Sequence, residues 1–345
     1  MSVDYSQGYT ARWRLQKLDV STWVPMEDVP NVISFSLDKD GTDTAPLLET
    51  GSVEIDVSRG GAFYPGWYRM SMVVEQSGAL DVVPIATLWF EATKGTVTGY
   101  NDKDSADGRS VLYPASVAIL DTDKYAPKGV DGAAWCANFL RKHTPAPVNV
   151  EGSFTLEDYY VFQEETKVLE AVWTLLDAGG FCIQIDGDGT INIRPKPTEP
   201  ALVLSRNTSA ILSASYDYTQ DSSNTPNVYV AIDGDSRARA ENNDPYSQTS
   251  TVSRGFEVVT VDTSPVRVNG ETLQSYAERR LYEERTMVER VLVYTREYWP
   301  DVAPFSIVRW FSGGDYPQDL TVKSQTLSFT NGIQVKETAV IYMEV

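Results

Sequence analysis

One stretch of the sequence, residues 163–197, predicts its own secondary structure throughout and constrains what can fold around it. Its first half predicts an amphipathic helix, because apolar side chains recur about one turn apart. Gly179 stands where a left-handed residue would end that helix. The second half changes to a period of two on either side of Asp-Gly-Asp-Gly, residues 186–189, which predicts a hairpin of two half-buried strands. The apolar positions are Val168, Leu169, Val172, Leu175 and Leu176 in the helix, and Phe181, Ile183, Ile185, Ile191 and Ile193 in the strands.

The length of 345 residues allows two or three domains, each with its own core. The net charge of -19 argues against nonspecific binding to nucleic acid or to an anionic membrane, since both need basic patches. The N-terminal sequence lacks the apolar core of a signal peptide, and the longest nearly apolar run, residues 82–90, is too short to span a membrane. We therefore expect a soluble chain made in the cytoplasm, with Cys136 and Cys182 as buried thiols.

The order of patterns along the chain predicts an α+β, mainly β fold in three parts. Residues 1–105 and 201–345 consist mostly of short alternating or apolar runs separated by Gly, Pro and Asp, which is typical of antiparallel barrels. Residues 106–200 predict an α+β insertion that contains the helix and hairpin, and its Pro-rich end, residues 194–200, is the best candidate for a linker. We expect two tube-like antiparallel β-barrel domains with this insertion between them.

Several local signals are specific enough to be checked. Asp131 predicts an N-cap for a helix through His143, whose basic last turn complements the helix dipole. The polar stretch 233–255 predicts an extended loop, and residues 271–290 predict a long helix with Asn269 as its cap. The buried stripe of that helix would consist of Leu273, Ala277, Leu281, Val288 and Val291, and its charged faces would pair Arg279 with Glu283, Arg280 with Glu284 and Arg285 with Glu289.

Residues that carry chemistry are few, and their types argue against an enzyme. His143 is the only histidine, which removes most Ser-His-Asp, Cys-His and histidine-rich metal sites. A zinc site made from Cys136, His143 and Cys182 would lack a fourth ligand and any usual spacing. No phosphate-binding loop or dinucleotide-binding glycine pattern is present. We predict no catalytic, cofactor-binding or metal-binding residues, and no enzymatic activity.

Acidic and aromatic clusters leave an alternative open. Asp186, Asp188 and Asn192 superficially suggest a calcium loop, but the later glutamate is missing and a hairpin turn explains the pattern better. Among 48 acidic residues, nothing singles out the carboxylate pair that a glycosidase requires. The aromatic cluster Phe-Tyr-Pro-Gly-Trp-Tyr, residues 63–68, fits a contact surface and local packing equally well. The alternative function is a carbohydrate-binding or glycan-active β-rich protein.

The order of elements resembles the hub proteins at the tail tip or baseplate of long-tailed bacteriophages and of contractile injection systems. The resemblance extends over most of the chain and rests on element order, without an invariant motif. Four segments carry it: the strand pair of residues 85–100, the helix and hairpin of 168–195, the strand of 227–235, and the late helix 275–284 with the strands that follow it.

The resemblance implies a structural role in a virion that is assembled in the host cytoplasm. Three copies of the chain would form a ring that caps the tail tube, anchors tail-tip or host-recognition proteins, and lets DNA pass without specific binding. The implied partners are the tail tube or distal tail protein, the tape measure protein, and tail fibre or receptor-binding proteins. The isolated chain would be monomeric, with Leu273, Leu281 and Val288 buried within its own fold.

The charge adds one expectation about such a ring. A basic channel wall would neutralise phosphates and hold DNA in place, so we expect an acidic or neutral wall. The loops 38–43 and 241–244 are candidates for this wall. The alternative is that these carboxylates only keep a large β-protein soluble.

Overall fold

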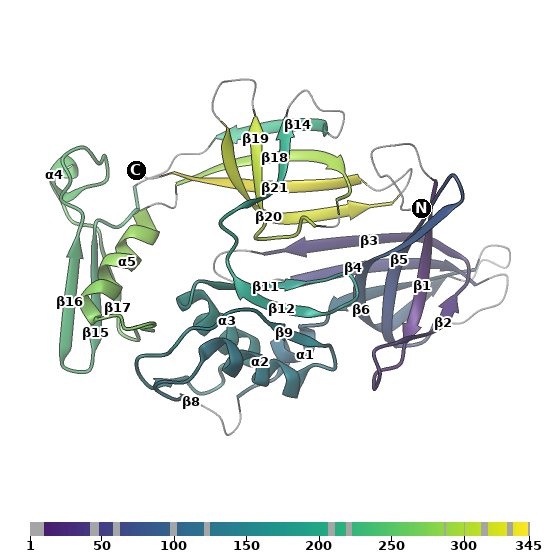
Figure 1. Cartoon of the computed structure of the whole chain (residues 1–345), viewed down its shortest axis with the longest axis horizontal. Helices are drawn as coiled ribbons and strands as arrows, with labels where there is room; N and C mark the ends of the chain where they lie inside the picture. The colour runs from purple at the N-terminus through teal and green to yellow at the C-terminus, as the bar shows by residue number, and fades with distance from the viewer. Residues whose placement is uncertain are drawn as a thin grey trace.

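The computed structural model describes residues 10–41, 48–57, 63–96, 102–120, 125–205, 211–218, 223–285, 288–299, 301–311, 317–329 and 334–343. Within these ranges the chain is mainly β, with a few helices, as the sequence predicts (Figure 1). Its dominant element is a sheet of thirteen strands, to which both ends of the sequence contribute. The first group of its strands is β1 (Thr10–Leu18), β2 (Pro25–Val29), β3 (Val32–Asp40), β4 (Leu48–Asp56), β5 (Gly66–Gln76), β6 (Ala79–Thr96) and β7 (Lys103–Ser110). The second group is β13 (Pro200–Ser205), β14 (Ile211–Tyr218), β18 (Val288–Glu297), β19 (Ile307–Phe311), β20 (Gln318–Ser328) and β21 (Gln334–Met343).

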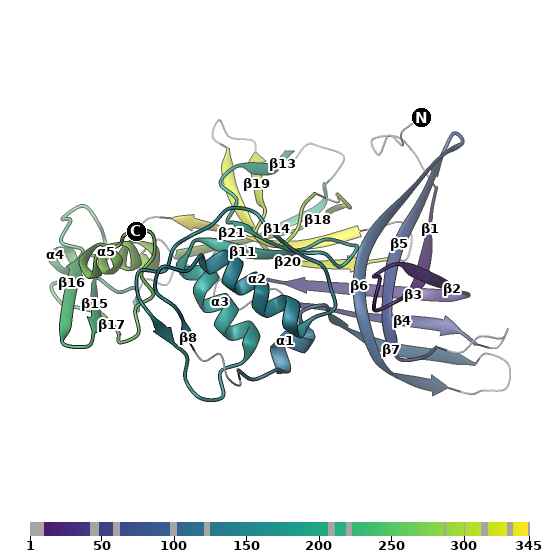
Figure 2. The ribbon, with the colours of Figure 1, turned by 60° about the horizontal axis from the view of Figure 1, so that its bottom comes forward.

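The two groups of strands are joined edge to edge. The strand order is β14-β18-β21-β20-β3-β4-β7-β6-β5-β1-β2, and β19 adds to β20 and carries β13. The pairing of β20 with β3, over Ser324↔Asp40 to Ser328↔Ser36, therefore connects strands that lie far apart in the sequence. Figure 2 shows the strong curvature of β5 and β6 around the first group. Among the described residues the ladder is an open path, so the closure into two tube-like barrels stays a prediction, as do the domain boundaries.

The residues between the two groups of strands contain helices and short strands and lie below the large sheet in Figure 1. We call this part the insertion, and its bounds as a domain stay a prediction. Asp131 caps its second helix by accepting hydrogen bonds from the backbone N–H groups of Ala133 and Ala134, as predicted. The five apolar positions predicted for the third helix are all at most 2% exposed, and each contributes about 1.5–3 kcal/mol relative to an exposed side chain. The elements are α1 (Tyr113–Val117), β8 (Tyr125–Ala126), α2 (Gly132–His143), β9 (Val148–Val150), β10 (Tyr160–Val161), α3 (Val168–Ala178), β11 (Phe181–Ile185) and β12 (Ile191–Pro195).

Two details of the helix and hairpin differ from the prediction. The left-handed residue after α3 is Gly180, with φ of 73°, whereas Gly179 has φ of -77°. Gly179 is required for a different reason, because a Cβ there would lie 2.6 Å from the ring of Phe154. Strand β11 is buried on both faces, not one, since Cys182 and Gln184 are as covered as their apolar neighbours.

The turn of the hairpin docks onto the first group of strands. Thr87 Oγ1 donates to the Gly187 carbonyl at 3.0 Å, and the Asp188 carbonyl accepts from Trp23 Nε1 at 2.9 Å and from Arg69 at 2.8 Å. A Cβ on Gly187 would meet the backbone oxygen of Pro84 at 2.0 Å. The Asp-Gly-Asp-Gly sequence therefore allows close backbone approach as well as a turn.

Residues 227–285 fold into a lobe at the opposite end of the molecule from β1 and β2 (Figure 1). The strand predicted at 227–235 is present, but it pairs within a separate three-stranded sheet, not in the large one. The stretch 233–255, predicted to be an extended loop, contains a strand and a short helix. The strand was missed because its buried positions are only Ala238 and Ala240, which have weak strand propensity. The lobe consists of β15 (Val228–Asp233), β16 (Ser236–Glu241), α4 (Thr251–Arg254), β17 (Val259–Asp262) and α5 (Leu273–Arg285).

Helix α5 is shorter than the predicted 271–290. Thr272 begins it, because its hydroxyl accepts from the Ser275 N–H at 3.1 Å while the Ser275 hydroxyl accepts from the Thr272 N–H at 2.9 Å. Asn269 instead accepts from the Thr155 N–H and is not the cap. Val288 and Val291 belong to β18, which pairs with β21 along its whole length. Of the predicted ion pairs, Arg279–Glu283 lies at 2.9 Å and Arg280–Glu284 at 3.9 Å, while Glu289 lies beyond the helix.

A row of buried polar side chains crosses the large sheet where the two groups of strands meet. Cross-strand register aligns Tyr294, Glu337, Gln325, Lys39 and Glu49, one from each of five neighbouring strands, and none is more than 8% exposed. We call these five residues the polar row. Gln325 Nε2 donates to Glu337 Oε1 at 2.5 Å, and Lys39 Nζ lies 2.9 Å from Glu49 Oε1.

The polar row separates two apolar cores on one face of the same sheet. Along β21, Val335 belongs to the first core, Glu337 to the row, and Ala339 to the second core. Arg296 flanks the row and holds Glu337 in a bidentate pair, at 2.8 Å from Nε and 2.5 Å from Nη2. Burial raises the pKa of Glu49, the positive charge of Lys39 opposes this shift, and Asp186 of the hairpin adds to it. The hairpin therefore also lies close to the row.

We expect Gly187→Ala to lower the free energy of unfolding by about 1–3 kcal/mol, because the added methyl meets backbone that cannot rotate away. Urea unfolding followed by tryptophan fluorescence measures the change. Gly234→Ala is a contrasting variant, since Gly234 has φ of 57° and a Cβ added there would have no atom within 4 Å, so it introduces backbone strain without collision. A Gly187→Ala protein as stable as the wild type would contradict the docking contact.

We expect Glu337→Leu to cost about 3–5 kcal/mol, because it leaves the Arg296 guanidinium buried without its carboxylate. The double variant Arg296→Met/Glu337→Leu should recover much of this loss, since neither charge of this pair then stays buried. Urea unfolding of both variants gives the comparison. Arg309→Met, which breaks the exposed Arg309–Asp319 pair in the same sheet, should change stability little. A double variant as unstable as the single one would disprove the charge-burial explanation.

Candidate functional site

Of the three side chains considered for metal or nucleophilic chemistry, the two cysteines lie in the core of the insertion and the histidine is half-buried at a helix end. Cys136 on α2 and Cys182 on β11 are both free thiols with no exposed surface. Burial raises the pKa of Cys136 well above its usual value and that of Cys182 to about 11. His143 lies at the end of α2. Among the described residues, no group of three His, Cys, Asp or Glu side chains could hold a metal ion.

The acidic hairpin turn forms its own hydrogen bonds. The Asp188 carboxylate accepts from the Thr190 N–H at 2.9 Å, and the Gly189 N–H donates to the Asp186 carbonyl at 2.8 Å. Asn192 accepts from Asn149 on the neighbouring strand β9. These contacts are those of a hairpin turn, which was the favoured interpretation of this pattern.

The aromatic cluster at residues 63–68 contributes mainly to packing. Phe63, Trp67 and Tyr68 are at most 7% exposed, and Phe63 stacks on Tyr68 with ring centroids 4.6 Å apart. Tyr64 alone of the described aromatic residues in the cluster is largely exposed, at 61%. Of the described aromatic residues in the cluster, only Tyr64 is therefore exposed enough to form a contact surface.

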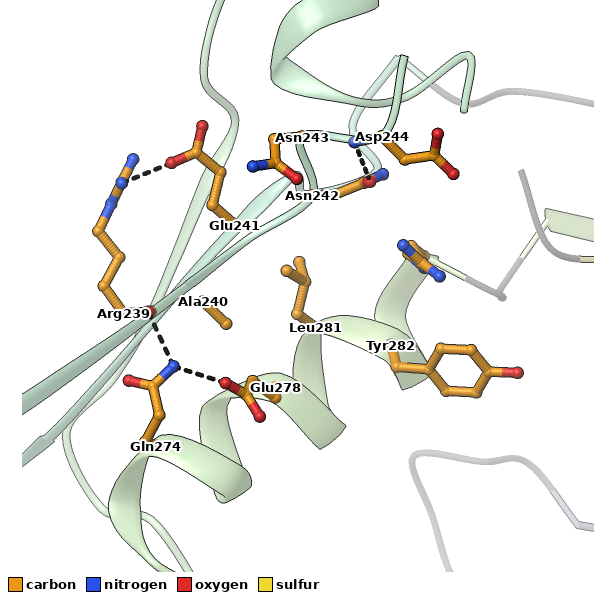
Figure 3. A pocket seen from close by; sticks show the side chains of 11 residues that line it. Arg239, Ala240, Glu241, Asn242, Asn243, Asp244, Gln274, Glu278, Leu281 and Tyr282 are labelled. Atoms are coloured by element: carbon orange, nitrogen blue, oxygen red, sulfur yellow. Dashed lines mark hydrogen bonds and ion pairs between the residues drawn. The ribbon is translucent and has the colours of Figure 1, made fainter. Parts of the chain in front are cut away.

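A groove in the lobe offers a binding surface, and no sequence pattern indicated it. It has a volume of about 360 Å³ and lies between β16 and α5 (Figure 3). Leu281 and Ala240 form its apolar floor, and Gln274 and Glu278 line the helix side. The turn of residues 242–244 closes one end, where Asn242 is buried and accepts from the Asp244 N–H. The groove was missed because its strand lies within the stretch that the sequence assigns to a loop.

The lobe holds α5 firmly against its sheet, so the groove has rigid walls. The Tyr276 hydroxyl donates to Asp262 Oδ2 at 2.6 Å, and the Tyr229 hydroxyl reaches the same oxygen at 3.2 Å. Burial raises the pKa of Tyr276, and its hydrogen bond to Asp262 raises it further, so the hydroxyl stays protonated as a donor. Thr260 on β17 donates to Glu284 on the helix.

The two loops that we suggested for an acidic channel wall, residues 38–43 and 241–244, lie in different parts of the fold. Residues 38–40 end β3 in the large sheet, and residues 42 and 43 lie outside the described ranges. Glu241 ends β16 in the lobe, where its carboxylate pairs with Arg239 at 2.7 Å. A hydrogen bond from Thr251 and the contact with Arg239 lower the pKa of Glu241, which keeps it charged.

No helix among the described residues combines the length and apolar character needed to cross a membrane. No family model matches the sequence, and no curated protein matches it significantly.

Solved structures do match the fold over nearly its whole length. A tail protein from Neisseria meningitidis MC58 superposes with a TM-score of 0.66 at 14% identity, covering 96% of this chain and 97% of its own. A prophage MuSo2 tail protein of 43 kDa from Shewanella oneidensis gives 0.65 at 12% identity, covering 97% and 100%. An E. coli protein described as a component of the type VI secretion system gives 0.51 at 11% identity, covering 91% and 74%. The resemblance to tail proteins that the sequence indicates is therefore confirmed at the level of the fold.

Proposed function

We propose that this chain is a structural component of a bacteriophage tail, placed at the tail tip or baseplate as a hub. The observation that carries the proposal is the reciprocal coverage of the two tail proteins: each superposition includes 96–97% of this chain and 97–100% of the tail protein. A shared fold at such low identity does not by itself assign a role. The agreement with an element order that the sequence had already linked to hub proteins adds independent support.

The hub role requires three copies in a ring that caps the tail tube and anchors tail-tip or host-recognition proteins. Closed rings need head-to-tail interfaces between unlike surfaces of neighbouring copies. The elongated molecule, with a curved sheet at one end and the lobe at the other, offers two such unlike ends (Figure 1). The insertion contacts Thr87 in the first group of strands and the Pro304 carbonyl in the loop between β18 and β19 of the second group, and these contacts support a rigid wall segment.

A ring of three copies would let DNA pass through its central channel, and the wall of that channel would be acidic or neutral. The net charge of -19 supports this, and Glu241 is one carboxylate held in its charged form. A tail role also implies a non-enzymatic protein in the virion. The glycan-binding alternative has lost its main support, since most of the aromatic cluster at residues 63–68 is packed in the core.

Light scattering of the purified chain and reconstruction of the tail particle together test the proposal. We expect a mass near 38.3 kDa for the isolated chain and three copies around a channel in the particle. We expect the two results to differ because neighbouring tail proteins complete the interfaces between copies only in the particle. A particle with one or six copies at this level, or without the protein, would overturn the hub role. A net-positive channel surface in that reconstruction would overturn the acidic wall alone.

A further inference from the structure

We propose that the groove between β16 and α5 binds an extended peptide segment of a partner protein, which adds to the free edge of β16 and carries a lysine or arginine. This mode of recognition, in which main-chain hydrogen bonds hold a peptide strand and pockets select alternate side chains, recurs at exposed sheet edges beside a helix. Figure 3 shows the edge strand on one side of the groove and α5 on the other. The inference concerns a binding site and does not depend on the number of copies in a ring.

The backbone of β16 is oriented for such an addition. Among the described residues, β16 forms a ladder with β15 alone, so its other edge faces the groove. The carbonyl of Arg239 on that edge accepts a hydrogen bond from Gln274 Nε2 at 3.2 Å. In an antiparallel pair the N–H and C=O of one residue point the same way, so the Arg239 N–H also faces the groove. Gln274 occupies the place of a donor that an incoming strand would supply.

The groove provides alternating side-chain environments along this edge. Leu281, only 5% exposed, and Ala240 form an apolar floor at its centre. Tyr282 lies at one side and is 52% exposed, with the guanidinium of Arg285 5.3 Å from its ring centroid. An aliphatic residue of the peptide would contact the floor, and its neighbours in the strand would point toward the polar rim.

The charges of the rim favour a basic segment. Arg239 is already compensated, because it donates to Glu241 at 2.7 Å and to Glu257 at 2.8 Å. Glu278 accepts from the neutral amide of Gln274 at 2.9 Å, and Asp244 from the Tyr246 N–H at 2.9 Å. The lining thus carries the three carboxylates of Glu241, Asp244 and Glu278 against the two guanidinium groups of Arg239 and Arg285. Glu257 offsets Arg239 further, so the rim is net negative and a lysine or arginine of the partner reduces the imbalance.

The experiment sorts a random peptide library displayed on yeast against the full chain, with Arg239→Pro as the counter-selection. Proline removes the N–H that faces the groove, yet it is tolerated at an outward-facing edge position. We expect enriched peptides that alternate β-branched residues with lysine or arginine. Fluorescence anisotropy of one synthesised peptide should show binding about tenfold weaker or worse for Arg239→Pro, because a main-chain hydrogen bond is lost and the ring obstructs the edge.

Two further variants separate the contribution of the main-chain hydrogen bonds to peptide binding from that of the charged side chains. Arg239→Ala removes the same side chain but keeps the N–H, so it should bind as tightly as the wild type or more tightly, since Glu241 is released. Glu278→Gln should weaken binding about twofold to fivefold, as expected for a partly exposed ion pair. Hydrogen exchange adds a readout that needs no variant: the peptide should slow exchange of the Arg239 and Glu241 amides in the wild-type chain.

Several results would overturn the proposal. Enriched peptides that bind Arg239→Pro as well as the wild type would disprove addition to this edge, as would amides at Arg239 and Glu241 that exchange at the same rate with and without peptide. A library without enriched sequences would disprove peptide binding. If Arg239→Pro changes the oligomeric state of the protein, measured by light scattering, the edge forms a contact between two copies and not a peptide site.

Discussion

The structure depends on the burial of charge at the polar row. There the two groups of strands join into one continuous sheet. A buried ion pair is costly to desolvate, and its own attraction only roughly offsets that cost. The pairs Arg296–Glu337 and Lys39–Glu49 are therefore weak candidates for a large net gain in stability. Their effect is on register, because a one-residue slip of β20 against β3 would place Gln325 and Lys39 on opposite faces of the sheet. The row thus fixes which strands of the two distant halves meet, while the apolar cores on either side supply the hydrophobic stabilisation.

The core of the insertion also includes residues of the first group of strands, among them Leu18 and Trp67, and the insertion lies below this junction in Figure 1. Its hairpin reaches the first group of strands with main-chain carbonyls at Gly187 and Asp188, and Gln184 reaches the Pro304 carbonyl beside the second group. Trp173 packs on Phe305, with ring centroids 5.8 Å apart, which adds an apolar contact to the polar ones. Contact of one compact unit with both halves of a long sheet makes the junction between the two groups of strands stiffer.

The lobe is attached to the same insertion by a short backbone pairing. Glu157 and Arg267 are joined through the Glu157 N–H and the Arg267 carbonyl at 3.0 Å, and the Gly270 N–H donates to Glu157 Oε1 at 2.6 Å. Val266 and Val268 extend into the core of the insertion, whereas the remaining apolar residues of the lobe form a small separate core. The groove therefore lies on a unit that has a small core of its own and is joined to the insertion by this pairing.

The sequence alone determined what depends on local period and capping. The helix at Val168–Ala178, its buried stripe, the hairpin that follows and the cap at Asp131 all matched, because each follows from the spacing of apolar residues or from one side chain beside a helix start. The sequence did not determine that Gly187 is needed for contact with Pro84, that β11 is covered on both faces, or that β15 leaves the large sheet. Nor did it indicate the groove, whose strand carries alanines where a strand signal needs larger residues.

The polar row could not be read from the sequence either, since Lys39, Gln325 and Glu337 look like ordinary exposed strand positions until the pairing of β3, β20 and β21 is known. Burial of a side chain on a sheet is decided by the strands beside it and the layer above it, and both are properties of the tertiary structure.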